Sequence, residues 1–123
     1  MILAADSSVA FVALLHAVFM LLEMFLWKRP AGRRLFGLSR EFSSRTAALA
    51  ANQGLYNGFL AAGLVWGLML NSIDIKLFFL ACVIIAGLFG AFTVNRSIFW
   101  FQALPGAVAL VLVLLSGTWE QPE

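Results

Sequence analysis

The sequence predicts an all-α integral membrane protein, built as a four-helix bundle in a single domain over residues 1–123. The first reason is composition: 63% of the residues are hydrophobic and 11% are charged, whereas soluble domains average about 45–50% and about 25%. The second reason is size, because a chain this short has too little interior to bury so much apolar surface. The third is that four apolar segments each come near the roughly 20 residues that cross a bilayer. Together these observations exclude a soluble enzyme, a nucleic-acid binder and a disordered linker.

The four apolar segments are the expected membrane spans, over residues 8–27, 46–70, 76–94 and 97–117. The first is expected to remain as a span, because it has neither the basic start nor the small-residue end of a cleaved signal peptide. Ser43 or Ser44 is the expected N-cap of the second span. In the fourth span, Pro105 is expected to kink or locally open the helix near Phe101.

The orientation follows from the charges between the spans. The connection over residues 28–45 carries six Lys or Arg residues and one acid, Glu41, and with four spans Arg96 falls on the same side. The opposite side holds Lys76 as its one basic residue, and the termini carry the acids Asp6, Glu120 and Glu123. The positive-inside rule then predicts a long basic cytoplasmic loop between helices 1 and 2, with both termini outside. A bacterial inner membrane is the expected location.

The tryptophans agree with this orientation. Trp27 and Trp100 fall at the expected inner boundary, and Trp66 and Trp119 fall near the outer one, as aromatic belts do. The 28–45 loop also places Leu35, Phe36, Leu38 and Phe42 among its arginines. Two interpretations stay open there: a short interfacial helix on anionic lipid headgroups, or a solvated anchor that binds nothing.

Small residues predict where the spans approach one another, because close contact between helices in lipid depends on them. The second span has two such faces, which places it at the centre of the bundle, and the third span has one. The faces are Gly54, Gly58 and Ala61; Gly63 and Gly67; and Cys82, Ala86 and Gly90. The single cysteine, Cys82, is therefore interpreted as a packing residue. The same faces would allow a homo-oligomer.

Polar residues inside the spans predict a site, because such residues normally face the interior of a membrane bundle. His16 and Glu23 are seven apart, which puts them within about 20° of one helical face. On the second span, the polar residues cover an arc of about 140° at matching depth in the cytoplasmic half. The candidate site residues are His16, Glu23, Asn52, Gln53, Tyr56, Asn57 and Gln102, with Arg96 as a possible counter-ion of Glu23. The expected site is one polar cavity, open to the cytoplasm.

Each candidate also has a structural interpretation. Asn52 and Gln102 would each serve equally well as an interhelical hydrogen bond, and a single His such as His16 often belongs to a helix core. No metal is expected, since His16 and Glu23 have no third His or Cys ligand nearby. No cofactor is expected either, because the sequence has no phosphate-binding loop, no paired histidines for haem and no other recognised catalytic motif.

Three stretches carry a family resemblance. They are Leu22-Glu23-Met24-Phe25-Leu26-Trp27, then Phe36-Gly37-Leu38, then the run from Ala51 to Gly63 that contains Asn-Gln-Gly-Leu-Tyr-Asn. Across essentially the whole chain, the sequence resembles a family of short four-span membrane proteins catalogued as domain of unknown function thirteen-oh-four. Its members are sometimes labelled putative epimerases. The resemblance implies the four-helix membrane fold and the pairing of the first and third stretches, and it implies no activity.

Three functions remain open from the sequence. The first is binding or transport of a small or lipophilic ligand, with Glu23 and His16 as titratable groups and a homo-oligomer forming the path. The second is an intramembrane acid–base enzyme of the isomerase or epimerase type, in which Glu23 or His16 transfers protons while Asn57 and Tyr56 polarise an oxygen. The third is a structural or assembly subunit. The expected partners are the lipid bilayer, anionic headgroups at residues 28–45 and further copies of the chain, with no nucleic acid.

Overall fold

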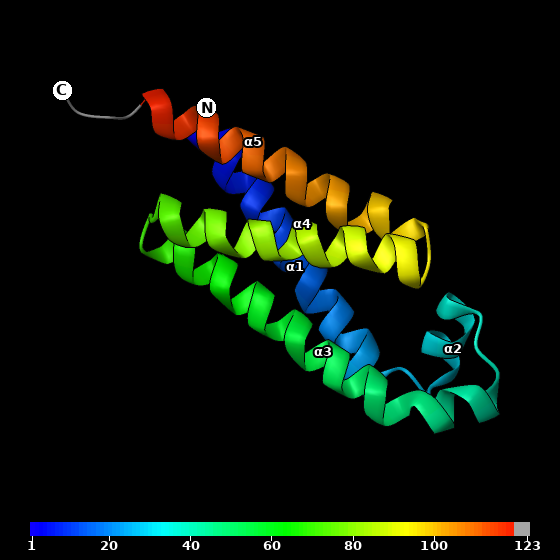
Figure 1. Cartoon of the computed structure of the whole chain (residues 1–123). Coiled ribbons are helices and arrows are strands. Elements are labelled where there is room, and N and C mark those ends of the chain that lie inside the picture. Colours follow the sequence, from blue (N-terminus) through cyan, green and yellow to red (C-terminus); the bar gives the residue numbers. More distant parts are fainter. Residues whose placement is uncertain (120–123) are drawn as a thin grey trace. The chain divides into compact units, whose positions relative to one another are not determined.

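The structure, a computed structural model, describes residues 1–119, with side chains to Gly117. Within this part of the chain every regular element is helical, so the all-α prediction is confirmed (Figure 1). The elements are α1 (Ile2–Phe25), α2 (Pro30–Phe36), α3 (Arg40–Met69), α4 (Ile73–Thr93), the π-helical segment η1 (Phe99–Ala103) and α5 (Leu104–Trp119). Glu120 and Glu123, and the side chain of Trp119, lie outside the described residues.

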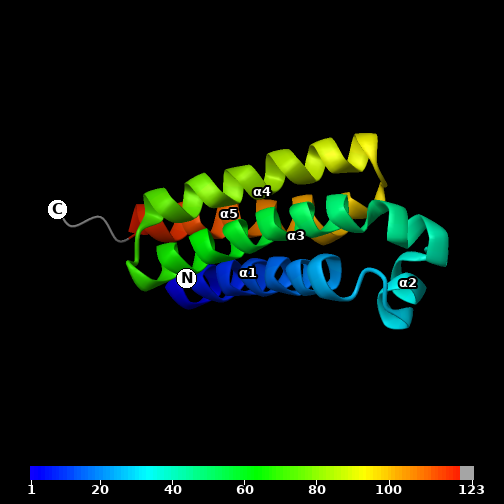
Figure 2. The same cartoon turned by 90° about the horizontal axis from the view of Figure 1, so that it is seen from below.

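The expected 28–45 loop is largely helical. Pro30 opens α2, where its fixed backbone angle suits the first turn and its missing N–H costs nothing. Gly37 ends α2 in the left-handed conformation at φ 66°, and its N–H donates to the carbonyl of Arg33. Figure 2 shows α2 after the end of α1 and before α3. The long connection between the first two expected spans therefore consists of two short segments around a helix, in agreement with the interpretation that a short helix forms there.

Helix α3 begins six residues before the expected span. The hydroxyl of Ser39 accepts the backbone N–H of Phe42 at 3.1 Å and thereby caps the helix. Ser43 is instead buried inside the helix, and its hydroxyl donates to the carbonyl of Arg40 at 2.9 Å. The expectation of a cap at Ser43 or Ser44 was wrong, because the polar and basic residues before the apolar run are themselves helical.

The opening expected near Pro105 is confirmed. Proline has no N–H to donate to the carbonyl four residues earlier, that of Phe101. The chain widens into the π-helical turn η1 just before this point, and the Leu104 N–H donates to the carbonyl of Phe99. Helix α4 lies very close to this turn: a Cβ added at Gly87 would lie 2.8 Å from the backbone nitrogen of Ala103. A glycine is therefore required where α4 meets η1.

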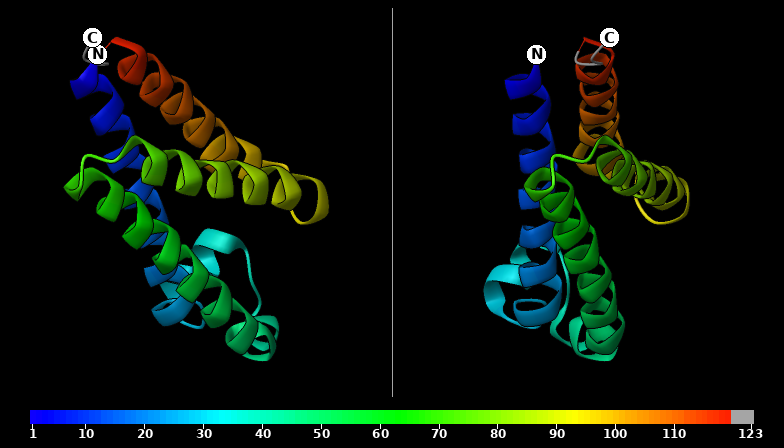
Figure 3. Two further views of the ribbon diagram at one scale, coloured as in Figure 1. Left: turned by 60° about the vertical axis from the view of Figure 1, so that its left-hand side comes forward. Right: turned by 90° about the vertical axis from the view of Figure 1, so that its left-hand side faces the viewer.

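The described chain divides into two compact units. One contains residues 1–13 and those from Ala62 onward, where α4 and α5 form an antiparallel hairpin (Figures 1 and 2). Its buried side chains include Leu80, Val83, Ala109 and Val113. The other unit, Leu14–Ala61, places the second half of α1 beside the larger, N-terminal part of α3 (Figure 3).

Three helical segments within residues 1–119 are long and apolar enough to cross a membrane: Ile2–Phe25, Ile73–Thr93 and Phe99–Gly117. They match three of the four expected spans, with ends displaced by up to six residues. Helix α3 has ample length at 30 residues. It is less apolar than these three segments because its middle contains Asn52, Gln53 and Asn57.

Candidate functional site

The second half of α1 and the middle of α3 are joined by a polar contact between two of the predicted site residues. The side-chain amide of Asn57 donates to the carboxylate oxygen Oε1 of Glu23. Asn57 is buried, with 6% of its surface exposed, and Glu23 is half-buried. This contact pairs the two sequence stretches whose pairing the family resemblance implies.

Two glycines on α3 allow this approach. A Cβ at Gly54 would lie 2.7 Å from Cγ of Met24, 3.0 Å from Cβ of Glu23 and 3.1 Å from the carbonyl oxygen of Met20. A Cβ at Gly58 would lie 2.7 Å from Sδ of Met20. The small-residue face predicted at Gly54 and Gly58 is thus the face that contacts α1, as expected for helices that associate in lipid.

A pocket of about 290 Å³ lies beside the carboxylate. It combines one acidic group, two basic groups and apolar surface, and its lining residues are Glu23, Met24, Phe25, Trp27, Lys28, Arg29 and Ala47. The indole of Trp27 donates to the hydroxyl of Thr46 at 3.0 Å and its ring lies 5.1 Å from that of Phe36. Trp27 therefore connects the end of α1 to both α2 and α3 and holds one wall of the pocket in place.

His16 lies in the same unit, fully buried, with its ring packed edge-on to Phe19 at a centroid distance of 5.4 Å. It is two turns from Glu23, or about 10 Å along the helix axis. Among the described residues, no group of three or more His, Cys, Asp or Glu side chains could hold a metal ion.

The other candidates lie in different surroundings. Asn52, Gln53 and Tyr56 are exposed on α3, in contrast to the buried Asn57. The side-chain amide of Gln102 donates to the carbonyl of Val83 at 3.1 Å, which is an interhelical hydrogen bond from η1 to α4.

Arg96 is exposed in the connection between α4 and η1. Its proposed role as counter-ion of Glu23 stays a prediction.

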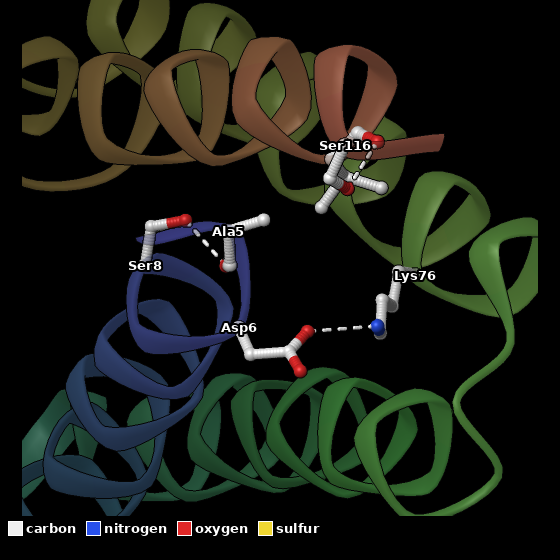
Figure 4. A network of polar contacts seen from close by, with 6 residues as sticks. Ala5, Asp6, Ser8, Lys76 and Ser116 are labelled. Atoms are coloured by element: carbon white, nitrogen blue, oxygen red, sulfur yellow. Dashed lines mark hydrogen bonds and ion pairs between the residues drawn. The ribbon is translucent and has the colours of Figure 1, made fainter. Parts of the chain in front are cut away.

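The sequence reasoning missed an ion pair between the start of α1 and the start of α4. The ammonium of Lys76 lies 2.9 Å from Oδ1 of Asp6 (Figure 4). Lys76 is 4% exposed, whereas the Asp6 side chain is 37% exposed. The hydroxyls of Ser8 and Ser116 nearby bond to carbonyls of their own helices. The sequence signal for this pair was Lys76, the one basic residue among the segments that the charge pattern predicts to lie outside, directly before an apolar run.

Fold and site together define a small helical protein with membrane-compatible helices and a carboxylate–amide pair beside a mixed polar and apolar pocket. Residues 10–114 match the family described as "Protein of unknown function (DUF1304)". The chain belongs to that family, which confirms the resemblance found in the sequence.

The chain is also similar to the "Uncharacterized protein YpaA" of Lactococcus lactis subsp. lactis (strain IL1403). The two are 30% identical over 104 residues, which cover 81% of this chain and 87% of that protein. No solved structure matches the chain. The family description and the relative's name state no activity, so the function is argued from the site.

Proposed function

We propose that the protein is an integral membrane protein that binds or transports a small or lipophilic ligand through a polar cavity in the cytoplasmic half of the membrane. The site is the pocket beside Glu23 and Asn57. Four helices cross the membrane in this proposal: α1, α3, α4 and η1 with α5. Both termini lie outside, and several copies assemble around the path because four spans are few for a transporter.

The observation that carries the proposal is the Glu23 carboxylate, held by the Asn57 amide at the wall of a pocket. A carboxyl group at membrane depth is costly and is retained where it has a use. The amide occupies Oε1, and a carboxylate has a second acceptor oxygen that can bind a donor on a ligand. Met24, Phe25 and Trp27 supply apolar surface for a hydrophobic portion, which suits an amphiphilic molecule.

A membrane crossing by α3 is supported by its length and by its partner. Thirty residues at about 1.5 Å each exceed a hydrocarbon core of about 30 Å. Asn57 bonds to Glu23 and Gly54 packs on α1, which is itself long and apolar enough to span. A helix paired in this way keeps its most polar buried side chain away from lipid.

The basic segment around α2 is proposed to bind anionic lipid headgroups. A second pocket, of about 380 Å³, lies there between Pro30, Arg33, Arg34, Gly37 and Leu38. Two guanidinium groups beside an exposed apolar edge, Leu35 and Phe36, suit a phosphate group at a membrane surface.

Native mass spectrometry in mild detergent tests the ligand site. The wild type should retain a small molecule or lipid in fixed stoichiometry, and Glu23→Gln should lower its affinity at least about tenfold, since a hydrogen bond to a charged group contributes about 1.5–3 kcal/mol. Glu41→Gln is the matched control, because Glu41 is exposed at the start of α3, and it should keep the ligand. Equal occupancy in all three proteins, or none in any, would reduce the pair to a structural link between helices.

A further inference from the structure

We infer that the pocket beside Glu23 takes a single-chain lipid phosphate, in which a free hydroxyl on the middle carbon of glycerol donates to the carboxylate. The inference rests on the proposed ligand site, and it names the chemical class of the ligand. Glycerol phosphate carries the same polar groups without a chain, so the experiment has to separate these two sources.

The pocket combines charges of both signs on one short stretch of chain. Glu23 lies in the last turn of α1, and the two basic residues of the lining, Lys28 and Arg29, follow the end of that helix. All seven lining residues belong to one compact unit, Leu14–Ala61. The carbonyl of Lys28 accepts a hydrogen bond from Nε of Arg33 at 3.2 Å, which holds the chain in place where it leaves α1. The pocket therefore offers an acceptor on the helix and two cations on the segment that follows.

These charged groups lie at different depths in the proposed orientation. Trp27 marks the expected inner boundary of the membrane, and Glu23, four residues earlier, lies about 6 Å closer to the membrane centre. Lys28 and Arg29 come directly after Trp27, and their long side chains can place their charges among the lipid headgroups. A ligand that meets both kinds of group therefore has its anion at the membrane surface and a hydrogen-bond donor just beneath it.

A glycerophospholipid with one chain removed has its groups in this order. The phosphate lies at the surface, the free glycerol hydroxyl lies next below it, and the remaining chain continues into the hydrocarbon. Lysine and arginine bind phosphate oxygens. The hydroxyl donates one hydrogen bond, and the carboxylate of Glu23 has Oε2 to accept it, since the Asn57 amide donates to Oε1.

Two other kinds of lipid fit less well. In a two-chain lipid the same glycerol oxygen is esterified, so it has no proton to donate to the carboxylate. An amine headgroup has a donor, but that donor lies on the water side of the phosphate, whereas Glu23 lies on the membrane side of Lys28 and Arg29 in the proposed orientation.

The size of the pocket suits the polar end of a lipid. Its volume of about 290 Å³ is at the small end of the roughly 300–1,000 Å³ that is typical of ligand pockets. Glycerol and phosphate can occupy such a space, and Met24 and Phe25 supply an apolar wall for the first part of the chain. The rest of the chain would lie in the bilayer.

Native mass spectrometry of the full chain in lipid nanodiscs tests this ligand class. Four probes are compared: oleoyl lysophosphatidic acid, its analogue that lacks only the glycerol hydroxyl, dioleoyl phosphatidic acid and glycerol phosphate. The wild type should bind the first at least about tenfold more tightly than each of the others, which lack either the donor or the chain. Equally tight binding of any of the other three would overturn the inference.

Variants assign the two ends of the ligand. Glu23→Gln should reduce the preference for the hydroxyl-bearing lipid over its analogue at least about fivefold, because a neutral acceptor forms a weaker hydrogen bond. Lys28→Gln combined with Arg29→Gln should weaken both lipids alike and leave that preference unchanged. Arg40→Gln is the matched control, because it removes a positive charge at the start of α3, outside the pocket lining. It should bind both lipids as the wild type does, and an unchanged preference in Glu23→Gln would contradict the assignment.

The same spectra separate this inference from the proposed function. A different ligand that the wild type retains and Glu23→Gln loses would overturn the lipid phosphate alone. Binding of no ligand by the wild type would overturn the proposed ligand site as well.

Discussion

At the scale of the residue, Lys76 shows how a charge is accommodated in an almost wholly apolar chain. Its side chain is 4% exposed and its ammonium lies 2.9 Å from Asp6. Lys76 also lies in the first turn of α4, where the helix dipole disfavours a positive charge. The carboxylate of Asp6 offsets both the cost of burying the ammonium and its unfavourable place at the helix start, and Asp6 itself remains partly accessible to water. The two partners are therefore unequal, which leads to an asymmetric prediction.

Asp6→Asn should destabilise the protein more than Lys76→Met. The first leaves a buried ammonium without its carboxylate, which we expect to cost about 1–3 kcal/mol, less than the roughly 3–5 kcal/mol of a fully buried pair because Asp6 is 37% exposed. The second replaces the lysine by an apolar side chain of similar volume and should stay within about 1 kcal/mol of wild type. Thermal unfolding in detergent measures both. Equal losses would contradict this account of the pair.

At the scale of the element, α3 has two glycines on one face with different neighbours. A Cβ at Gly54 meets a backbone carbonyl and the Cβ of Glu23, neither of which can move without shifting α1. A Cβ at Gly58 meets only the thioether of Met20 within 3.5 Å, and that side chain is flexible. The pairing of α1 and α3 therefore depends on Gly54 far more than on Gly58.

Gly54→Ala should lower stability by about 1–3 kcal/mol through overpacking. It should also weaken ligand binding at the adjacent pocket, since Glu23 would be displaced. Gly58→Ala is the matched control: Met20 can rotate away, and alanine's better helix propensity, worth about 1 kcal/mol, offsets the crowding. Chemical denaturation in mild detergent, read by circular dichroism, compares them. Tolerance of Gly54→Ala would show that α1 and α3 are not closely packed.

At the scale of the whole molecule, the proposed crossing of the membrane by α3 fixes the sides on which its two flanking segments lie. The basic segment around α2 precedes α3, and the start of α4 follows it. The location of these two segments therefore shows whether α3 crosses the membrane. If α3 crosses, those flanking segments lie on opposite sides of the bilayer. If it lies along the surface, they lie on the same side.

A membrane-impermeant thiol reagent applied to intact spheroplasts distinguishes these cases. In a Cys82→Ala background, Asp74→Cys should be labelled from outside, whereas Arg34→Cys should be labelled only after the membrane is opened. Both positions are exposed in the structure, so access depends on the membrane alone. Labelling of both from the same side would refute the four-span topology.

At the candidate site, the structure brings some of the predicted residues together and leaves others apart. Glu23 and Asn57 are both predicted site residues because polar side chains inside the spans face the bundle interior, and they do bond to each other, although the expected depths match Glu23 with Asn52 and Gln53. Asn52 and Tyr56 were selected by the same reasoning and lie on the exposed side of α3. An arc of about 140° was too wide to have a single environment, and the sequence pattern could not show which edge of it would meet α1.

The helical class, three membrane-compatible helices and the opening before Pro105 could all be predicted from the amino-acid sequence. These properties arise from composition and from bonds within four or five residues, so they can be recognised locally. The pairing of Glu23 with Asn57 rather than Asn52, and of Asp6 with a buried Lys76, became visible only in the packed helices. Such pairs join residues 34 and 70 positions apart. Such pairs depend on which helix faces approach most closely. A glycine such as Gly54 allows a close approach because it has no side chain to hold the neighbouring helix away.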